Sequence, residues 1–360
     1  MISYCTNVHP AEDVEGIVAQ LDRYALPVRE RLGADRLGVG LWLSAPVARG
    51  LAGDPSARRR FRAELDARGL AVVTLNAFPY GGFHDEVVKR AVYRPTWTEP
   101  DRVAYTVDCV TVLADLLAED AAYGSISTLP LAWREPWTSR DDHAAAEAFG
   151  QVVRAIRRTG DRPIRLAVEP EPGCVLDTVA DALSWLSGRV DPEYVGLCLD
   201  TCHLAVSFAD PAETLATIAK SGLDVVKVQA STALHVEKPA EAQDALAAFA
   251  EPRYLHQVRE LGGDGTVHRA DDLDEAGTEL PGEGPWRVHF HLPLHQEPVA
   301  PFGSTTEVLR AVAAGLPAGP HVEVETYTWS VLPDAGDLVG GIAAELEWAG
   351  RNLVAEGVSA

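Results

Sequence analysis

The sequence predicts an α/β fold in which eight parallel strands close into a (β/α)8 barrel. Short apolar runs alternate with longer amphipathic stretches along the chain. Such runs are typical of parallel strands, because helices cover both faces of the sheet. Strict strand and helix alternation is typical of a barrel or an open parallel sheet. A barrel uses ~250 residues or more, and this chain has 360 residues, of which 47% are hydrophobic. We expect one domain spanning residues 1–360.

Eight apolar runs are the predicted strands, and the amphipathic stretches between them are the predicted helices. Thr178 and Asp142 are candidate N-caps, whereas Gly69 and Gly222 stand where a helix should stop. The strands are residues 2–5, 36–43, 71–76, 124–127, 164–169, 195–200, 224–229 and 321–325. The helices include residues 12–32, 56–68, 102–119, 142–158, 178–186 and 212–221.

The gap between the seventh and eighth predicted strands is much longer than the others. Residues 230–286 are therefore predicted to be an insertion, with a helix over residues 240–260 and an acidic stretch over 271–279. A further strand-like run follows at 287–292. Long loops at a barrel mouth are usually functional. We expect this segment to be a lid over the mouth or, alternatively, an interface in a homo-oligomer.

The net charge of the chain limits the classes of partner that it is expected to bind. With 31 basic and 53 acidic residues the net charge is −22, and such a field repels nucleic-acid backbones and anionic lipid surfaces. No run approaches the ~18 apolar residues of a membrane span, and the first residues do not resemble a signal peptide. Five cysteines without a CxxC pair indicate free thiols. We expect a cytoplasmic protein that binds a small metabolite, without nucleic acid or membrane insertion.

Four predicted strands end in side chains that can hold a divalent metal. They are Glu169, Asp200, Gln229 and Glu325. In a closed parallel barrel the carboxyl ends of all strands meet at one mouth, so these residues should converge. Carboxylate and amide oxygens suit Mg²⁺ or Mn²⁺ and are tolerable to Zn²⁺. Glu323 competes with Glu325, but Glu325 is nearer the strand's carboxyl end.

The same residues resemble a known family, the xylose-isomerase-like TIM barrels of the sugar phosphate isomerase/epimerase superfamily. The most specific motif is Leu199-Asp-Thr-Cys-His203, which is similar to the superfamily's Asp-Thr-x-His. Gln229 resembles the hydroxypyruvate-isomerase branch. A narrower likeness, to EboE-type metabolite-traffic proteins, rests on residues 76–84, 169–174, 254–257, 289–291 and 325–329. That name records gene-cluster context and implies no known reaction.

The resemblance implies roles for three residues. Glu169 and Glu325 would bind the metal and also act as base and acid, and His203 would lie beside the substrate. On chemical grounds, a metal-bound carbonyl and hydroxyl favour loss of the adjacent C–H proton, which two carboxylates can remove and return. The leading hypothesis is therefore a metal-dependent isomerase or epimerase acting on a sugar, polyol or hydroxy-ketone.

Further polar residues are candidates for a second metal or for substrate binding. His289 and His291 alternate along one strand-like run, so both can face one side. The other candidates are His256, placed within the predicted inserted helix, Glu171 in a Pro-flanked turn and His84 in a Gly-rich loop. If they bind a second metal, a hydrolase or phosphodiesterase is the alternative. A third hypothesis is a binding or traffic protein without turnover.

Overall fold

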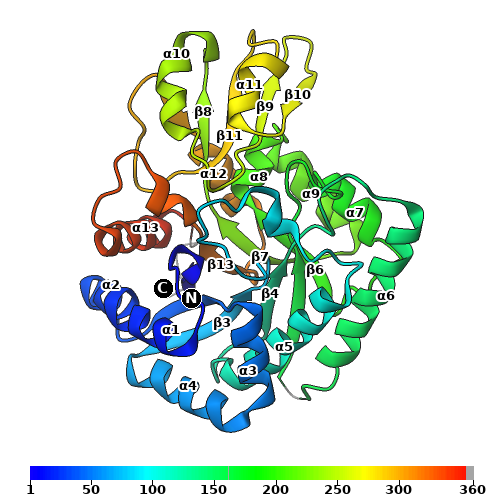
Figure 1. Ribbon diagram of the computed structural model, residues 1–360, viewed down its shortest axis with the longest axis vertical. Coiled ribbons are helices and arrows are strands. Elements are labelled where there is room, and N and C mark those ends of the chain that lie inside the picture. Colours follow the sequence, from blue (N-terminus) through cyan, green and yellow to red (C-terminus); the bar gives the residue numbers. More distant parts are fainter. Residues whose placement is uncertain (161, 354–360) are drawn as a thin grey trace.

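The protein forms a closed barrel of eight parallel strands, as predicted (Figure 1). In this computed structural model, residues 1–160 and 162–353 are described. The strand order around the barrel is β1-β13-β7-β6-β5-β4-β3-β2. The barrel strands are β1 (Ile2–Cys5), β2 (Leu37–Trp42), β3 (Leu70–Asn76), β4 (Gly124–Thr128), β5 (Ile164–Val168), β6 (Val195–Asp200), β7 (Val225–Ala230) and β13 (His321–Val324).

Helices surround the barrel and cover the outer faces of its strands (Figure 1). Strands β2, β3, β4 and β6 are buried at every position, which explains the largely apolar sequences of β2, β3 and β6. The surrounding helices are α1 (Val14–Gln20), the π-helical turn η2 (Leu21–Ala25), α2 (Leu26–Leu32), α3 (Ala45–Gly53), α4 (Pro55–Ala67), α5 (Pro100–Leu116), α6 (Ser139–Ile156), α7 (Val179–Leu186), α8 (Thr201–Val206), α9 (Pro211–Ser221), α12 (Thr306–Gly315) and α13 (Leu338–Asn352).

Local signals at the helix ends were mostly reliable. Thr178 caps α7, with its hydroxyl accepting from the Asp181 N–H, as predicted. The prediction that Asp142 caps the next helix was wrong, because the N-cap of α6 is Thr138, four residues earlier, which forms a capping box with Asp141. Asp142 instead accepts hydrogen bonds from two tryptophan indoles. Gly222 ends α9 in the left-handed conformation, with φ of 78°.

The insertion after β7 forms a separate five-stranded antiparallel sheet in the order β10-β9-β11-β8-β12. It extends beyond residue 286, because its last strand ends at Ser304. The predicted helix over 240–260 is confirmed only in its first part: α10 ends at Leu246 and the chain is extended by β9, since Pro252 cannot continue a helix. The elements are β8 (Ala233–Val236), α10 (Pro239–Leu246), β9 (Val258–Leu261), β10 (Val267–Ala270), α11 (Leu273–Glu279), β11 (Trp286–His291) and β12 (Phe302–Ser304).

The two faces of this second sheet have different partners. Along β11, the apolar side chains of Trp286, Val288 and Phe290 pack into a cluster that includes residues of α10 and α11. The alternate residues, Arg287, His289 and His291, project from the opposite face, as the pleat of a strand requires. The guanidinium of Arg287 donates to the Ala205 carbonyl of the barrel at 2.7 Å. The polar face of the sheet is therefore turned toward the barrel.

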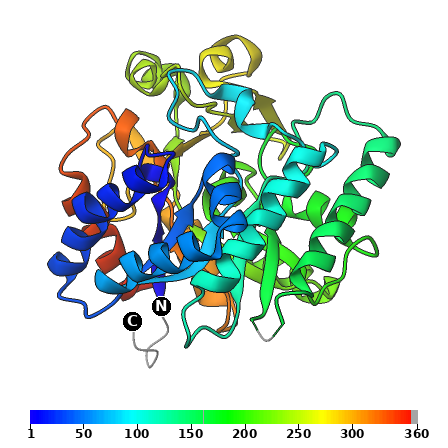
Figure 2. The ribbon, with the colours of Figure 1, turned by 60° about the horizontal axis from the view of Figure 1, so that its bottom comes forward.

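Ion pairs between the insertion and the barrel loops hold the second sheet in place. Asp271 pairs with Arg134 at 2.7 Å and with Arg90 at 2.9 Å. Arg259 pairs with Asp177 at 2.9 Å. Figure 2 shows the two inserted helices at the end of the barrel opposite the amino terminus, which is the end where the strands terminate. The insertion thus covers the carboxyl-terminal mouth. Among the described residues, no helix is both long and apolar enough to cross a membrane.

Candidate metal centre and active-site cavity

Four neighbouring strands of the barrel supply the predicted oxygen ligands. Glu325 follows β13, Gln229 lies in β7, Asp200 ends β6 and Glu169 follows β5. These strands are consecutive around the barrel, in the order β13-β7-β6-β5. Asp200 pairs with Gln229 in the register between β6 and β7. The side chains predicted to converge are therefore placed at one mouth, with the two glutamates as the outer members.

The carboxylates form a buried cluster that suits a cation. Glu169, Asp200 and Glu325 each offer an oxygen within 4.8 Å of the other two, and each is at most 5% exposed. Among the described residues, Glu169 Oε2, Asp200 Oδ2 and both amide atoms of Gln229 have no hydrogen-bond partner. Buried polar atoms are rarely left without a partner. These orphaned oxygens, from residues with hard donors, fit a divalent metal.

Electrostatics support the same interpretation. Burial, followed by the nearby charges of Glu325 and Asp200, raises the pKa of Glu169 well above its usual range. Burial, followed by Asp200 and Glu323, raises the pKa of Glu325 to about 8. Carboxylates this close repel one another in a dry environment. A divalent cation would remove that repulsion and keep both glutamates ionised.

Residues that sequence reasoning missed orient the cluster. Asn7, in the 3-10 turn η1 (Thr6–Val8) that follows β1, and Asn76, at the end of β3, donate to Oε1 of Glu325 at 2.7 and 2.9 Å. Ser231 donates to Oδ1 of Asp200 at 2.8 Å. Asn7 and Asn76 carry the same signal as the ligands, a polar side chain at a strand end. That signal could have identified them.

A buried ion pair lies deeper in the barrel, below the carboxylate cluster. Nζ of Lys227 is 2.6 Å from Oε2 of Glu323, and neither side chain is exposed. Lys227 precedes Gln229 by two residues, and Glu323 precedes Glu325 by two, so both project into the barrel below the cluster. Glu323 is therefore engaged by Lys227, which leaves Glu325 at the mouth.

Three histidines lie beside the carboxylates, and each contacts an oxygen atom through its Nδ1. His203 Nδ1 lies 2.8 Å from the Pro170 carbonyl, His289 Nδ1 lies 2.7 Å from Gln257 Oε1 and His291 Nδ1 lies 2.7 Å from the Glu325 carbonyl. Burial lowers the pKa of His291 to about 4 and that of His289 well below its usual range. Both imidazoles are therefore neutral, with Nε2 lone pairs available.

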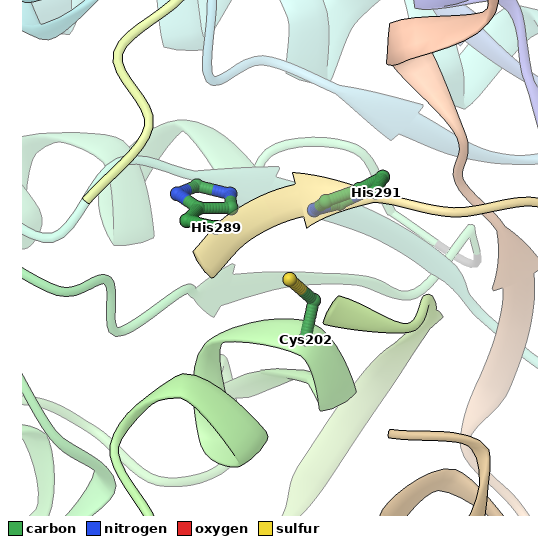
Figure 3. Close-up of side chains that lie close together, drawn as sticks. All are labelled: Cys202, His289 and His291. Atoms are coloured by element: carbon green, nitrogen blue, oxygen red, sulfur yellow. The ribbon is translucent and has the colours of Figure 1, made fainter. Parts of the chain in front are cut away.

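Figure 3 shows the rings of His289 and His291 on β11, with the thiol of Cys202 on α8 directed toward them. The three residues can each offer one ligand atom within 4.8 Å of the others. Burial, followed by the charge of Asp200, raises the pKa of Cys202 well above its usual range. The thiol therefore keeps its proton, and the histidines are the better donors.

The remaining predicted candidates differ in their placement. Glu171 lies near the histidines, and its Oε1 accepts from the Tyr93 hydroxyl at 2.7 Å. His256 lies in the extended segment before β9, and its ring nitrogens contact the His289 carbonyl and Glu251 Oε1, both at 2.9 Å. Both ring nitrogens of His256 face acceptor oxygens, so neither is free to bind a metal. His84 contacts the Asn7 carbonyl at 2.7 Å and is not among the residues that line the cavity.

A cavity opens between the carboxylates and the insertion. It contains roughly 530 Å³ of space between atoms, part of it open to solvent. Its floor carries Glu169, Glu325 and His203, and the insertion contributes Tyr254 and His289. Aromatic rings form much of the wall, with Phe83 packed against Tyr254 and Tyr327 at centroid distances of 5.1 and 5.6 Å. The cavity combines an acidic floor with apolar walls.

The chain belongs to the family of xylose isomerase-like TIM barrels, whose family model matches residues 30–291. A comparison with curated proteins finds no match. Among solved structures the chain is similar to L-ribulose 3-epimerase, with 14% identity, a TM-score of 0.55 and coverage of 98% of this chain and 94% of that one.

Two further structures share the fold. A xylose isomerase-like TIM barrel protein from Mycobacterium smegmatis in complex with magnesium is 14% identical, with a TM-score of 0.53 and coverage of 96% of this chain and 97% of that one. The IOLI protein with a bound zinc atom is 12% identical, with a TM-score of 0.51 and 98% of each chain covered. At these identities the likeness concerns the fold alone.

Proposed function

We propose that this protein is a divalent-metal-dependent isomerase or epimerase acting on a sugar, polyol or hydroxy-ketone. The observation that carries the proposal is the buried set of Glu169, Asp200, Gln229 and Glu325: the first three carry polar atoms without a partner among the described residues, and the two glutamates line the floor of a cavity. These four residues would hold Mn²⁺, Mg²⁺ or Zn²⁺. When bound, the ion supplies positive charge that stabilises the charge developing on substrate oxygens.

The protein's own residues would move the proton. Glu169 and Glu325 are the outer members of the four, separated around the barrel by β6 and β7. A substrate carbon above the cluster would have one carboxylate on each side. One glutamate removes the proton beside the carbonyl and the other returns one, so the configuration of that carbon is inverted or the carbonyl is moved. His203, on the same floor, would orient a substrate hydroxyl.

The cavity favours a neutral substrate. Its floor is acidic, and Lys89, a basic residue in the lining, is paired with Asp272. Among the described lining residues, an anionic phosphate would therefore meet acidic side chains and no unpaired Lys or Arg. The rings of Phe83 and Tyr327 can cover the apolar face of a carbon chain or ring. The likeness to L-ribulose 3-epimerase supports an unphosphorylated sugar or a related hydroxy-ketone.

We also propose that the insertion acts as a lid, because its ion pairs hold it over the mouth. A covered cavity excludes water and protects a reactive intermediate.

The narrower placement among EboE-type metabolite-traffic proteins is likewise a proposal. It is supported by the position of two of its motifs, Tyr254–Gln257 and His289–His291, along the cavity.

Proton exchange tests the proposed reaction. Protein loaded with Mn²⁺ is incubated in D₂O with a panel of unphosphorylated ketoses and hydroxy-ketones, and deuterium beside the carbonyl is followed by NMR. We expect exchange in the wild type and loss of at least a hundredfold in Glu169→Gln and Glu325→Gln, because an amide cannot accept the proton. Asp120→Asn is the matched control, since Asp120 is an exposed acid paired with Arg36 outside the cavity. Full exchange in protein stripped of metal would contradict the proposal.

A further inference from the structure

The part of the cavity wall that lies beyond the strand ends is mostly apolar. Its side chains come from three segments that are far apart in the sequence: the loop after β3, the insertion, and the turn η5 (Tyr327–Val331) after β13. We call this surface the apolar wall, and it consists of Phe78, Phe83, Val88, Val92, Leu255 and Tyr327. Each of these residues except Val92 is at most 8% exposed. Because barrel loops and insertion share the wall, it is complete only when the insertion covers the mouth.

The polar backbone groups along the apolar wall are already bonded within the protein. The Val88 N–H donates to the Arg253 carbonyl at 2.8 Å, and the Phe78 N–H donates to Asn76 Oδ1 at 3.0 Å. A ligand hydroxyl placed here would lose hydrogen bonds to water without replacing them, which is unfavourable. The buried hydroxyl of Tyr254 is an exception, since it has no partner among the described residues and can bind one oxygen atom. The apolar wall therefore suits a group with few hydroxyls.

The floor of the same cavity has the opposite character. Asn7 Oδ1 and His291 Nε2 are buried atoms without a hydrogen-bond partner in the described part of the chain, and both residues line the cavity. Asn7 Nδ2 donates to the Glu325 side chain, and His291 Nδ1 lies 2.7 Å from the Glu325 carbonyl, so both residues belong to the carboxylate end. Ligand hydroxyls can thus be satisfied at the floor. The cavity suits a molecule with one polar end and one apolar end.

The size of the cavity supports the same conclusion. Its space of roughly 530 Å³ lies within the ~300–1,000 Å³ that is typical of sites for drug-sized ligands. A molecule as small as hydroxyacetone would occupy the floor and leave the apolar wall uncovered. Uncovered apolar surface facing water is unfavourable, and an apolar group on the ligand would remove it.

We propose that the substrate of this protein joins a polar head, which carries the carbonyl and hydroxyl of the reaction, to an apolar chain or ring that lies against the apolar wall. The inference rests on the proposed function, which places the carbonyl above Glu169 and Glu325. The substrate class is therefore a hydroxy-ketone, sugar or polyol that bears an apolar substituent. A free sugar would present hydroxyls to the apolar wall.

A homologous series of ligands tests the apolar wall. Dissociation constants are measured by ligand-observed NMR, in excess Mg²⁺, for hydroxymethyl ketones whose other substituent is methyl, propyl, pentyl or phenyl. Full burial of each CH₂ group increases affinity about fourfold. We expect the pentyl ketone to bind at least about thirtyfold more tightly than the methyl ketone, even with partial burial. Equal affinity across the series would overturn the inference.

Variants of the apolar wall show where the chain binds. Leu255→Ser puts a hydroxyl into the wall and should reduce the pentyl-to-methyl ratio of affinities by about fivefold or more. Val92→Ser is a second variant, because Val92 is only partly buried and its replacement disturbs folding less. Leu280→Ser is the matched control: Leu280 is 8% exposed, like Leu255, but packs in the cluster of α10 and α11. A ratio that both wall variants leave unchanged would place the chain elsewhere and refute the inference.

Proton exchange in D₂O separates this inference from the proposed function. If affinity rises with chain length and none of the ketones exchanges the hydrogen beside its carbonyl, the apolar wall stands as a binding surface and the proposed reaction fails. If the ketones exchange this hydrogen and affinity is independent of the chain, the proposed reaction stands and the inference fails.

Discussion

Metal binding at the oxygen cluster should be visible as thermal stabilisation that depends on Asp200. This carboxylate is 2% exposed, and its Oδ2 is without a partner among the described residues. A ligand present at a hundredfold its dissociation constant stabilises the folded state by about 2.7 kcal/mol. Unfolding entropy is about 2.1 cal/mol/K per residue, which for 360 residues is about 0.76 kcal/mol/K. Saturating Mn²⁺ should therefore raise the melting temperature by about 4 °C.

Asp200→Ala should remove most of that rise. If losing one charged ligand weakens binding about a hundredfold, the same Mn²⁺ concentration stabilises by only about 0.4 kcal/mol, which is about 0.5 °C. Asp200→Ala also removes the N-cap of α8. Losing such a cap costs about 1 kcal/mol, which lowers the melting temperature of the metal-free variant by about 1 °C. Calorimetry with and without Mn²⁺ measures both the metal-dependent rise and the melting temperature of the metal-free variant. A variant that keeps the full metal-dependent rise would refute the assignment.

Two further predictions concern buried charged residues near the site. Lys227→Met should lower the free energy of unfolding by about 3–5 kcal/mol, because Glu323 is left as an unpaired buried charge. Adding Glu323→Gln to this variant should restore most of the lost stability. Urea titrations that show a loss of less than about 1 kcal/mol for the single variant would contradict this prediction. Burial raises the pKa of Glu345 from 4.5 to about 7, so its contribution to stability is fully present below pH 4.5 and is lost as pH rises through 7. The loss amounts to about 3 kcal/mol, and Glu345→Gln should flatten that slope in unfolding measurements between pH 5 and 8.

The barrel and the convergence of the four candidate ligands could be predicted from the sequence because both depend on local patterns. A strand buried on both faces must be apolar, and a polar residue at its end is conspicuous. Closure of the barrel then brings Glu169, Asp200 and Glu325 together, whatever paths the helices take. The helix stop at Gly222 and the cap at Thr178 are equally local, since each depends on a few neighbouring backbone groups.

What the sequence could not determine is how the insertion folds back on the barrel. The predicted helix over 240–260 overlooked Pro252, and β9 satisfies its backbone by pairing with β10 on one side and β11 on the other. The contact of His289 with His203 joins residues 86 positions apart, and it depends on the register of the second sheet and on ion pairs such as Arg259–Asp177. Such contacts are set by the packing of whole elements and leave no periodic trace in the chain. The sequence by itself therefore determined the barrel and the oxygen cluster, whereas only the tertiary structure decided which histidines complete the cavity.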